Sequence, residues 1–392
     1  MKNIIIMTIC IFAILGIAYL LSEDKRRVNK KTVLVGTALL AGLVLFVIKT
    51  SVGAMLLEKI ALGVDQLSKF GLEGVGFVFG ELSTNTYIFA INVLSLLVFT
   101  STLISVLNYV GVLPFIIKHL GGALSKILGI GKAEAICAVG NTLLGQTEAP
   151  LLTKPYLKSL NDSELFAVLV SGMGSASASI LIGYSMLGIP MEYLLVAIFA
   201  VPFSTIVISK IMKPSDEGTL DNVEVSKSEA QSLFDAISMG CQDGLNLALN
   251  VGASLIAFVG LIALINGFLG LFGVSLSSIL GFILTPLAWI FNIPASEVST
   301  FASLMGTKIS VNEFVAFTEM STVLDSLSPR TIAILASSMC NFGAISSIGI
   351  MLGGLSAIEP SIRPRVSKYA TKALIGAILS SLLTGAFVGL FF

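Results

Sequence analysis

Long apolar runs separated by short polar stretches dominate this sequence. A membrane-spanning helix needs about 17 to 25 predominantly apolar residues, because the hydrocarbon layer is about 30 Å thick. Eight runs reach this length, at 3–21, 33–49, 87–111, 163–187, 192–212, 245–268, 329–355 and 369–391. The pattern predicts an all-α integral membrane protein with eight transmembrane helices, forming a single unit over residues 1–392.

The composition agrees with a membrane protein. Hydrophobic residues make up 55% of the chain and charged residues 12%, more apolar than one soluble core requires. The formal net charge is zero, so the charge indicates neither nucleic acid nor an acidic partner. The four cysteines stand singly in apolar surroundings, which is typical of small core residues rather than of a disulfide or zinc site.

Lys and Arg residues predict the orientation. The first apolar run is followed by "SEDKRRVNKK", whose cations should stay in the cytoplasm and distinguish this run from a cleaved secretion signal. Eight crossings then place the N- and C-termini outside. Lys59, Lys69 and Arg330 are the main cations on the side expected to face outward.

Two further apolar regions, 131–160 and 296–325, are interrupted by polar residues and read as re-entrant hairpins. The first contains "GNTLLGQTEAPLL", in which Pro150 disfavours helical geometry at the preceding residue and predicts a turn at 145–148 followed by a new helix. Irregular backbone at membrane depth is tolerated only where protein or a watery cavity satisfies it. The polar tip of this hairpin therefore predicts a hydrated cavity.

The second hairpin contains "MGTKISVNEFVAF". We expect its break at 306–310 and a restart with Asn312 as N-cap. Each second half-helix then begins with a carboxylate near its positive dipole end, Glu148 in one and Glu313 in the other.

A span rich in Gly, Ser and Ala follows each hairpin, with its small residues at 171–184 and at 337–354. Such residues also allow close helix packing. The same order of long span, amphipathic segment, hairpin, broken span and final span occurs at 91–212 and at 246–391. Three crossings separate the hairpins, so the second unit is inverted. Inverted repeats with broken helices are the architecture of secondary transporters, and the breaks mark their binding site.

The polar groups of the two tips suit a neutral solute rich in hydroxyl and amide groups. They are the amide, hydroxyl and carboxyl groups of Gln146, Thr147, Glu148 and Glu313, joined by Asn341, Ser346 and Ser347. Two alternatives remain for the carboxylates. They could bind a divalent metal, or each Glu could have a structural role. A polar face on the span near 245, formed by Asp243, Asn246 and Asn250, indicates a hydrated helix start or part of the path.

"GNTLLGQTEAPLL", "TKISVNEFVAF" and "SSIGIMLGGL" resemble signature segments of the concentrative nucleoside transporter family, over essentially the whole chain. The resemblance implies that Gln146, Thr147 and Glu148 contact the nucleobase, that Glu313 and Ser347 bind the ribose hydroxyls, and that Phe342 lines the site. Sodium-coupled members imply a sodium site formed by the side chains of Asn141 and Ser175 and backbone carbonyls near Leu144 and Ala176.

One segment departs from the family pattern. The family commonly has "GFANxSS" where this chain has "NFGAISS", so Ala344 replaces the family's ribose-contacting Asn. Asn341 lies three residues earlier, nearly one helical turn, and is expected to present its amide to the same cavity.

The resemblance implies a sodium-coupled symporter that imports nucleosides as a homotrimer, with sodium as the coupling ion and no other cofactor. Segments 53–117 and 228–270 are expected to form a stationary scaffold, and 118–212 and 271–392 two moving hairpin repeats. A proton-coupled nucleoside carrier is the alternative within transporters. An intramembrane enzyme would need a nucleophile with a base or an HExxH motif, and a channel a continuous polar pore; the sequence indicates neither.

Overall fold

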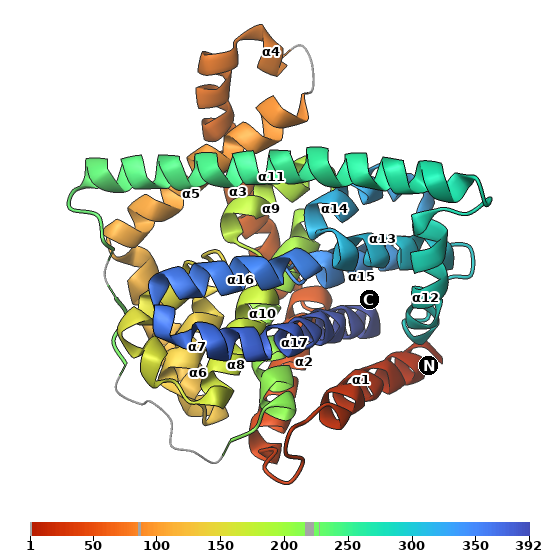
Figure 1. Ribbon diagram of the computed structural model, residues 1–392, viewed down its shortest axis with the longest axis horizontal. Coiled ribbons are helices and arrows are strands. Elements are labelled where there is room, and N and C mark those ends of the chain that lie inside the picture. The colour runs from red at the N-terminus through yellow and green to blue at the C-terminus, as the bar shows by residue number, and fades with distance from the viewer. Residues whose placement is uncertain (1, 85–87, 216–222, 227) are drawn as a thin grey trace.

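The computed structural model describes residues 2–84, 88–215, 223–226 and 228–392, and within these ranges every regular element is helical (Figure 1). The fold is thus the all-α membrane class that the sequence predicts. The N-terminal half contains α1 (Lys2–Leu20), α2 (Lys30–Lys49), α3 (Ser51–Phe79), α4 (Glu81–Thr84), the π-helical η1 (Ala90–Leu94), α5 (Ser95–Tyr109), α6 (Val112–Leu128), α7 (Lys132–Gly140), the 3₁₀-helical η2 (Ala149–Ser159), α8 (Asp162–Met173), α9 (Ala178–Met186) and α10 (Met191–Met212). The C-terminal half contains α11 (Leu233–Gly270), α12 (Leu276–Ile290), α13 (Val298–Ser310), α14 (Glu313–Ser321), η3 (Leu324–Ser326), α15 (Pro329–Met339), α16 (Ile345–Ile358), η4 (Pro360–Ile362) and α17 (Arg363–Phe391).

Most expected crossings correspond to helices of spanning length. Among the described residues, six segments are long and apolar enough, at 3–20, 30–49, 90–109, 162–186, 191–212 and 360–391. The other two expected crossings are not among these six. The run at 245–268 is part of the longer α11, which begins at Leu233. The run at 329–355 is divided into α15 and α16, as expected of a broken span.

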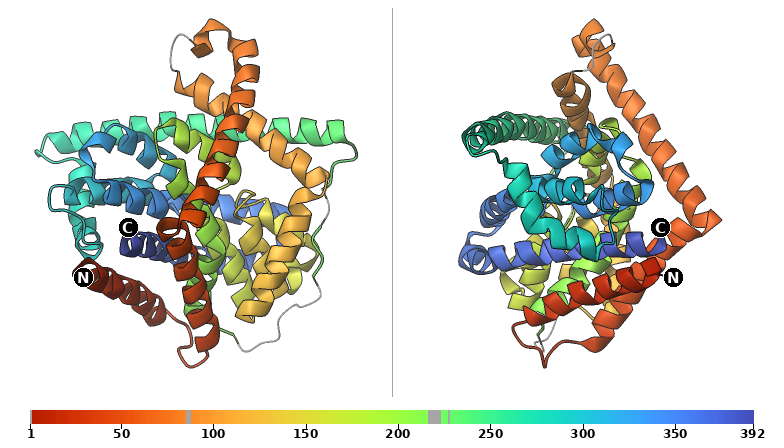
Figure 2. Two further views of the ribbon diagram at one scale, coloured as in Figure 1. Left: turned by 180° about the vertical axis from the view of Figure 1, so that it is seen from behind. Right: turned by 90° about the vertical axis from the view of Figure 1, so that its right-hand side faces the viewer.

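Helix α3 was not predicted, because charged residues interrupt its apolar pattern. One pair of them, Asp65 and Lys69, forms an ion pair of 2.8 Å one turn apart on the helix surface. In Figure 2, α3 runs along the outside of the molecule, and α4 lies at its far end. The charges are compatible with a helix because both side chains of this pair are 57% exposed.

The two repeats expected from the sequence are visible in the order of the elements. The first runs through α5, α6, the pair α7 and η2, the broken pair α8 and α9, and α10. The second runs through α11, α12, the pair α13 and α14, the broken pair α15 and α16, and α17. Equivalent elements pack on each other, α5 against α11 and α10 against α17.

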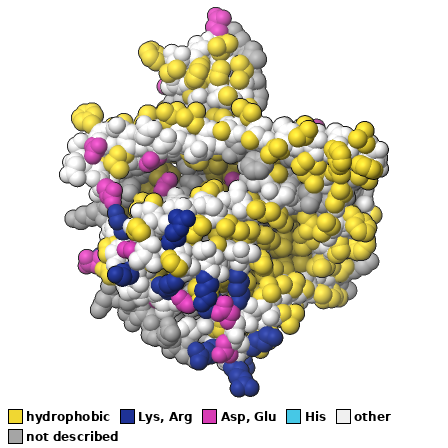
Figure 3. Space-filling model, in the orientation of Figure 1, with side chains coloured by type: hydrophobic (Ala, Val, Ile, Leu, Met, Phe, Trp, Pro, Cys, Tyr) yellow, Lys and Arg dark blue, Asp and Glu magenta, His cyan; other side chains and the backbone are white. Residues whose placement is uncertain are grey.

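Charged loops gather at one end of the molecule. Glu23, between α1 and α2, binds Lys213 at the end of α10 and Lys372 in α17, the latter at 3.1 Å. Burial alone would raise the pKa of Glu23, but hydrogen bonds and charges from the two lysines outweigh it and lower the pKa below its usual value. In Figure 3, Lys and Arg side chains gather toward the lower edge of the molecule, whereas its right side is largely hydrophobic.

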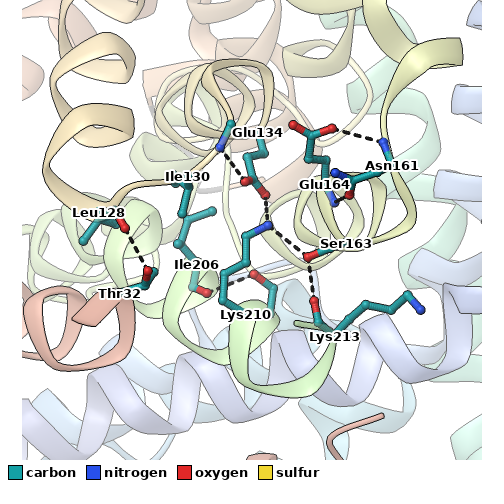
Figure 4. Close-up of polar contacts among 12 residues, drawn as sticks. Thr32, Leu128, Ile130, Glu134, Asn161, Ser163, Glu164, Ile206, Lys210 and Lys213 are labelled. Carbon is teal, nitrogen blue, oxygen red and sulfur yellow. Dashed lines mark hydrogen bonds and ion pairs between the residues drawn. The ribbon is translucent and has the colours of Figure 1, made fainter. Parts of the chain in front are cut away.

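The base of the first hairpin lies at this same end (Figure 4). Glu134 of α7 is fully buried, and its carboxylate lies 2.6 Å from Lys210 Nζ on α10. Lys210 also donates to Ser163 Oγ at 3.0 Å, and the backbone N–H of Gly131 donates to Glu134 at 2.9 Å. These contacts fix the start of the hairpin to α8 and α10.

The base of the second hairpin lies at the opposite end. Ser328, which precedes α15, donates to Glu297 at the start of α13. Next to it, Arg330 donates to the carbonyl oxygen of Gly389 near the C-terminus, and Asn3 at the N-terminus donates to the same oxygen. Since α1 and α17 each connect the two ends, the two hairpins enter the molecule from opposite faces.

Candidate functional site

The tips of the two hairpins face one cavity of about 830 Å³. The tips and both broken helices contribute residues to its walls, and α11 closes one side. In Figure 3 the surface is hollowed beneath α11, and acidic side chains are visible inside the hollow. A volume of this size suits a small organic solute, since such sites typically span about 300–1,000 Å³.

The first tip is the turn between α7 and η2, where the sequence predicts it, with Pro150 in the first turn of η2. The backbone N–H of Gly145 donates to a carboxylate oxygen of Glu148 at 3.2 Å, which closes the turn. Gln146, Thr147 and Glu148 all line the cavity. Gln146 is 8% exposed, and its Oε1 is buried without a hydrogen-bond partner. An unpaired buried acceptor is costly, so Gln146 is suited to a ligand that supplies a donor.

The second tip lies slightly later than expected. Residues 306–310, where we expected the break, remain helical to the end of α13, and the chain breaks at 311–312. The polar side chains of this segment find partners within the protein, as when Ser310 Oγ donates to the Gly306 carbonyl at 2.7 Å. Asn312 caps α14 as predicted, accepting from the backbone N–H of Val315 at 2.9 Å.

Glu313, the first residue of α14, lines the cavity opposite the first tip. The hydroxyl group of Tyr184 donates to Glu313 Oε1 at 2.9 Å. One carboxylate oxygen is thereby held in place, and the other oxygen is available to accept hydrogen bonds from a solute.

The two broken helices cross at their interruptions, which occupy 174–177 and 340–344. The backbone N–H of Phe342 donates to the Ser175 carbonyl at 2.8 Å, so one break is bonded directly to the other. Phe342 and Ser347 line the cavity, and the Ser347 hydroxyl donates to the Phe342 carbonyl.

Asn341 has different partners from those the sequence suggested. It is 1% exposed and is not among the residues that line the cavity. Its Oδ1 accepts from Lys308 Nζ at 2.5 Å, and its Nδ2 donates to the Ser338 carbonyl at 2.8 Å. Ala344, three residues later, is buried and immediately precedes α16. Lys308 was missed because no sequence pattern shows that a lysine in "MGTKISVNEF" is buried.

The residues expected to bind sodium lie in the first tip and in the first break. Asn141, Leu144, Ser175 and Ala176 are all buried. Asn141 Nδ2 donates to Ser171 Oγ at 3.1 Å, which joins the tip to the last turn of α8. Asn141 Oδ1 is buried without a partner, and Ser175 Oγ donates to the Gly172 carbonyl.

Helix α11 supplies a polar wall that faces the hairpins. The cavity is lined on this side by Asp243, Asn246 and Asn250. The sequence allowed two interpretations of these residues, a hydrated helix start or part of the solute path. A second cavity, of about 850 Å³, lies between α3 and α10. It contains none of the hairpin-tip residues, so we assign the candidate site to the first cavity.

Three family profiles match consecutive parts of this chain. Profiles described as "Na+ dependent nucleoside transporter" match at residues 9–82 for the N-terminus and 193–389 for the C-terminus. A profile described as "Nucleoside recognition" matches residues 90–191 between them. Together they cover most of the chain.

Relatives of known name match along nearly the whole chain. Nucleoside permease NupC of Helicobacter pylori is 37% identical, over 96% of this chain and 94% of that protein. Sodium/nucleoside cotransporter 1 of Rattus norvegicus is 30% identical, over 98% of this chain and 63% of that protein.

Solved structures agree with the arrangement of the helices. CNTnw in an inward-facing substrate-bound state superimposes with a TM-score of 0.96 at 36% identity, over 99% of this chain and 98% of that one. A variant of CNTnw in an outward-facing state also gives a TM-score of 0.96, at 34% identity over 100% of this chain and 98% of that one.

Proposed function

The chain belongs to the Na+-dependent nucleoside transporter family, the concentrative nucleoside transporters, and from this premise we propose that it imports nucleosides by sodium symport. The observation that carries the proposal is that Glu148 and Glu313 line one cavity from opposite hairpins. An inward sodium gradient would then drive accumulation of the nucleoside.

The cavity offers groups for both parts of a nucleoside. Gln146, Thr147 and Glu148 present acceptors and donors suited to the polar edge of a nucleobase. Glu313, with one oxygen held by Tyr184, and Ser347 line the same cavity and would meet the ribose hydroxyls. Phe342 would pack against the solute. We do not assign Asn341 a direct contact, because its side chain is engaged by Lys308.

Asn141 supports sodium as the coupling ion. Its unpaired Oδ1 is a neutral oxygen in a fully buried position, the kind of ligand that binds a sodium ion at an unwound helix. Ser175 and the carbonyls of Leu144 and Ala176 would complete the set. Among the described residues there is no group of three or more His, Cys, Asp or Glu, so a divalent metal finds less support than a sodium ion.

The contact between the breaks supports coupling. An ion bound at Asn141 and Ser175 would order the first break, and the hydrogen bond from Phe342 to Ser175 carries this order to residues that line the cavity. The nucleoside would then find its site already arranged and bind more tightly. By linkage, the nucleoside must strengthen sodium binding by the same factor.

We propose that the hairpin repeats, 118–212 and 271–392, move against a scaffold formed by 53–117 and 228–270. Helix α11 supports this division because it faces the cavity with Asp243, Asn246 and Asn250 and carries large apolar residues that are exposed in the single chain. These include Ile256 and Leu264, at 81% and 70% exposure. Such an apolar surface suits lipid or a neighbouring protomer, which fits a homotrimer. The cations around Glu23 suit the cytoplasmic side, with both termini outside.

The test is uptake of labelled uridine, adenosine and inosine by proteoliposomes, with sodium and proton gradients imposed separately. We expect accumulation above the external concentration under a sodium gradient, and its loss on adding a sodium ionophore. Accumulation driven by protons alone would replace sodium with protons as the coupling ion. Equilibration without accumulation under either gradient would contradict active transport.

A further inference from the structure

Lys308 of α13 is fully buried, and its side chain ends in the second break. Among the described residues it is the only Lys or Arg in the buried class. Its Nζ donates to Asn341 Oδ1 at 2.5 Å and to the Gly343 carbonyl at 2.8 Å. Both acceptors are neutral oxygens, so this ammonium group is held in the way that a small cation is held by an unwound helix.

The break is shaped closely around this ammonium group. Asn341 Oδ1 also accepts from the backbone N–H of Gly343 at 3.0 Å. A Cβ atom at Gly343 would lie 2.8 Å from Asn341 Oδ1 and 3.2 Å from Lys308 Nζ, closer than ordinary contact. The site also follows the C-terminal end of α15, where the helix dipole favours a positive charge.

The position of Lys308 corresponds to that of Asn141 in the first repeat. Each lies at or near the end of the first hairpin helix, shortly before an acidic residue that lines the cavity. Ser175 in the first break follows Asn141 by 34 positions. Asn341 and Gly343 in the second break follow Lys308 by 33 and 35 positions.

We propose that Lys308 is a tethered cation that occupies, in the second repeat, the place where the first repeat binds sodium. The ammonium group keeps the second break ordered at all times, so Lys308 is a positioning residue for nucleoside binding. Only one mobile cation is then needed per nucleoside. The comparison rests on the sodium site proposed at Asn141, whereas the role of Lys308 in ordering the break does not depend on it.

The physical consequence concerns the nucleoside more than the fold. Phe342 lies between the two residues that bind the ammonium group, and Ser347 donates to the Phe342 carbonyl. Without the cation, the carbonyl of Gly343 and the amide of Asn341 lose their shared donor, and this cavity wall loses its fixed shape.

The experiment compares Lys308→Ala with Lys308→Met in purified protein, with uridine binding as the readout. We expect Lys308→Ala to weaken uridine binding about 100-fold, as for loss of hydrogen bonds to a charged group. Methylammonium or ethylammonium at tens of millimolar should improve the uridine affinity of Lys308→Ala at least tenfold, because a small amine can enter the space left by the side chain. Lys308→Met fills that space without a charge and should show the loss without the rescue.

Two results would overturn the proposal. One is wild-type uridine affinity in Lys308→Met, and the other is a folded Lys308→Ala that no amine rescues. Size-exclusion chromatography and thermal unfolding check the fold. If the Lys308 variants do not fold, Gly343→Ala takes their place: it crowds the ammonium site without touching the cavity, and unchanged uridine affinity would contradict the ordering role.

The sodium titration of wild-type uptake tests the mobile cation separately. A Hill coefficient of about 1 is expected, and about 2 would contradict a single mobile cation. If sodium has no effect on wild-type uptake, the proposed sodium symport fails, while amine rescue still decides the role of Lys308.

Discussion

The backbone N–H of Phe342 donates to the carbonyl oxygen of Ser175 at 2.8 Å, so the two broken helices are bonded at their interruptions. One residue lies in the buried group proposed for sodium and the other lines the cavity. A single backbone hydrogen bond therefore connects the proposed ion site to the proposed solute site. Changes on one side should be measurable on the other.

Asn141→Ala should weaken sodium activation of uptake more than it disturbs folding. The substitution removes a buried oxygen that has no partner in the protein, so few internal contacts are lost apart from the bond to Ser171. A hydrogen bond to a charged group contributes about 1.5–3 kcal/mol, and we take the same range for the contact between Asn141 and the sodium ion. Its loss should raise the sodium concentration for half-maximal uptake by about 10- to 100-fold. The measurement is uridine uptake by proteoliposomes over a sodium titration.

The matched control is Thr142→Val in the same tip. The Thr142 hydroxyl donates only to the Val139 carbonyl within its own turn, so sodium activation should stay near wild type. Unchanged sodium activation in Asn141→Ala, or an equal loss in Thr142→Val, would speak against the sodium assignment.

Glu313→Gln should nearly abolish nucleoside transport while preserving the shape of the second tip. The amide can still accept from Tyr184, but its nitrogen cannot accept from a ribose hydroxyl. We expect uridine affinity to fall about 100-fold. Glu319→Gln is the control, since Glu319 lies on the same helix, accepts from Thr307 at 2.9 Å and does not line the cavity. Active transport by Glu313→Gln would contradict the assignment of Glu313 to the nucleoside site.

Gly354→Ala should displace the first tip from α16. A Cβ at this position would lie 2.3 Å from Thr147 Cγ2, a distance that real structures do not show. We expect uridine affinity to fall about tenfold or more, because Thr147 must move out of the cavity wall. Adding Thr147→Ser removes the clashing methyl group and should recover part of the loss.

The neighbouring Gly353 provides a control for this prediction. A Cβ there meets no atom within 4 Å, so Gly353→Ala should bind uridine like the wild type. Equal effects of the two alanine substitutions would show that helix α16 itself, rather than its contact with Thr147, determines the affinity.

Local signals made the hairpins predictable from the sequence. Pro150 and Asn312 act on the residues beside them, and both second half-helices begin where these residues require. The expected break at 306–310 was wrong because polar residues were interpreted as breaking a helix, whereas the fold gives them partners. Lys308 finds its acceptors 33 and 35 positions away, and no local pattern encodes such a contact.

Distance along the chain also explains the remaining differences. Asn341 was expected in the cavity because its spacing from the family position is nearly one turn, but the chain is not helical between Met339 and Ile345. The length of α11 and the existence of α3 were missed because polar or charged residues interrupt their apolar patterns, and these residues stay exposed on the helix surface. The polar residues of the hairpin tips thus predicted the cavity, whereas the arrangement of its walls required the structure.

The ion pair between Glu134 and Lys210 should hold the first hairpin to α10. Removing the lysine should lower the free energy of unfolding more than removing the charge of the glutamate. Lys210→Met leaves the fully buried carboxylate of Glu134 without its cation, which costs about 3–5 kcal/mol in buried pairs. Glu134→Gln should cost less, because Lys210 is partly exposed and retains its bond to Ser163. The double variant should be more stable than Lys210→Met alone, since no unpaired charge is left. Thermal unfolding of the four proteins in detergent measures this cycle, and additive losses would mean that the two side chains do not interact.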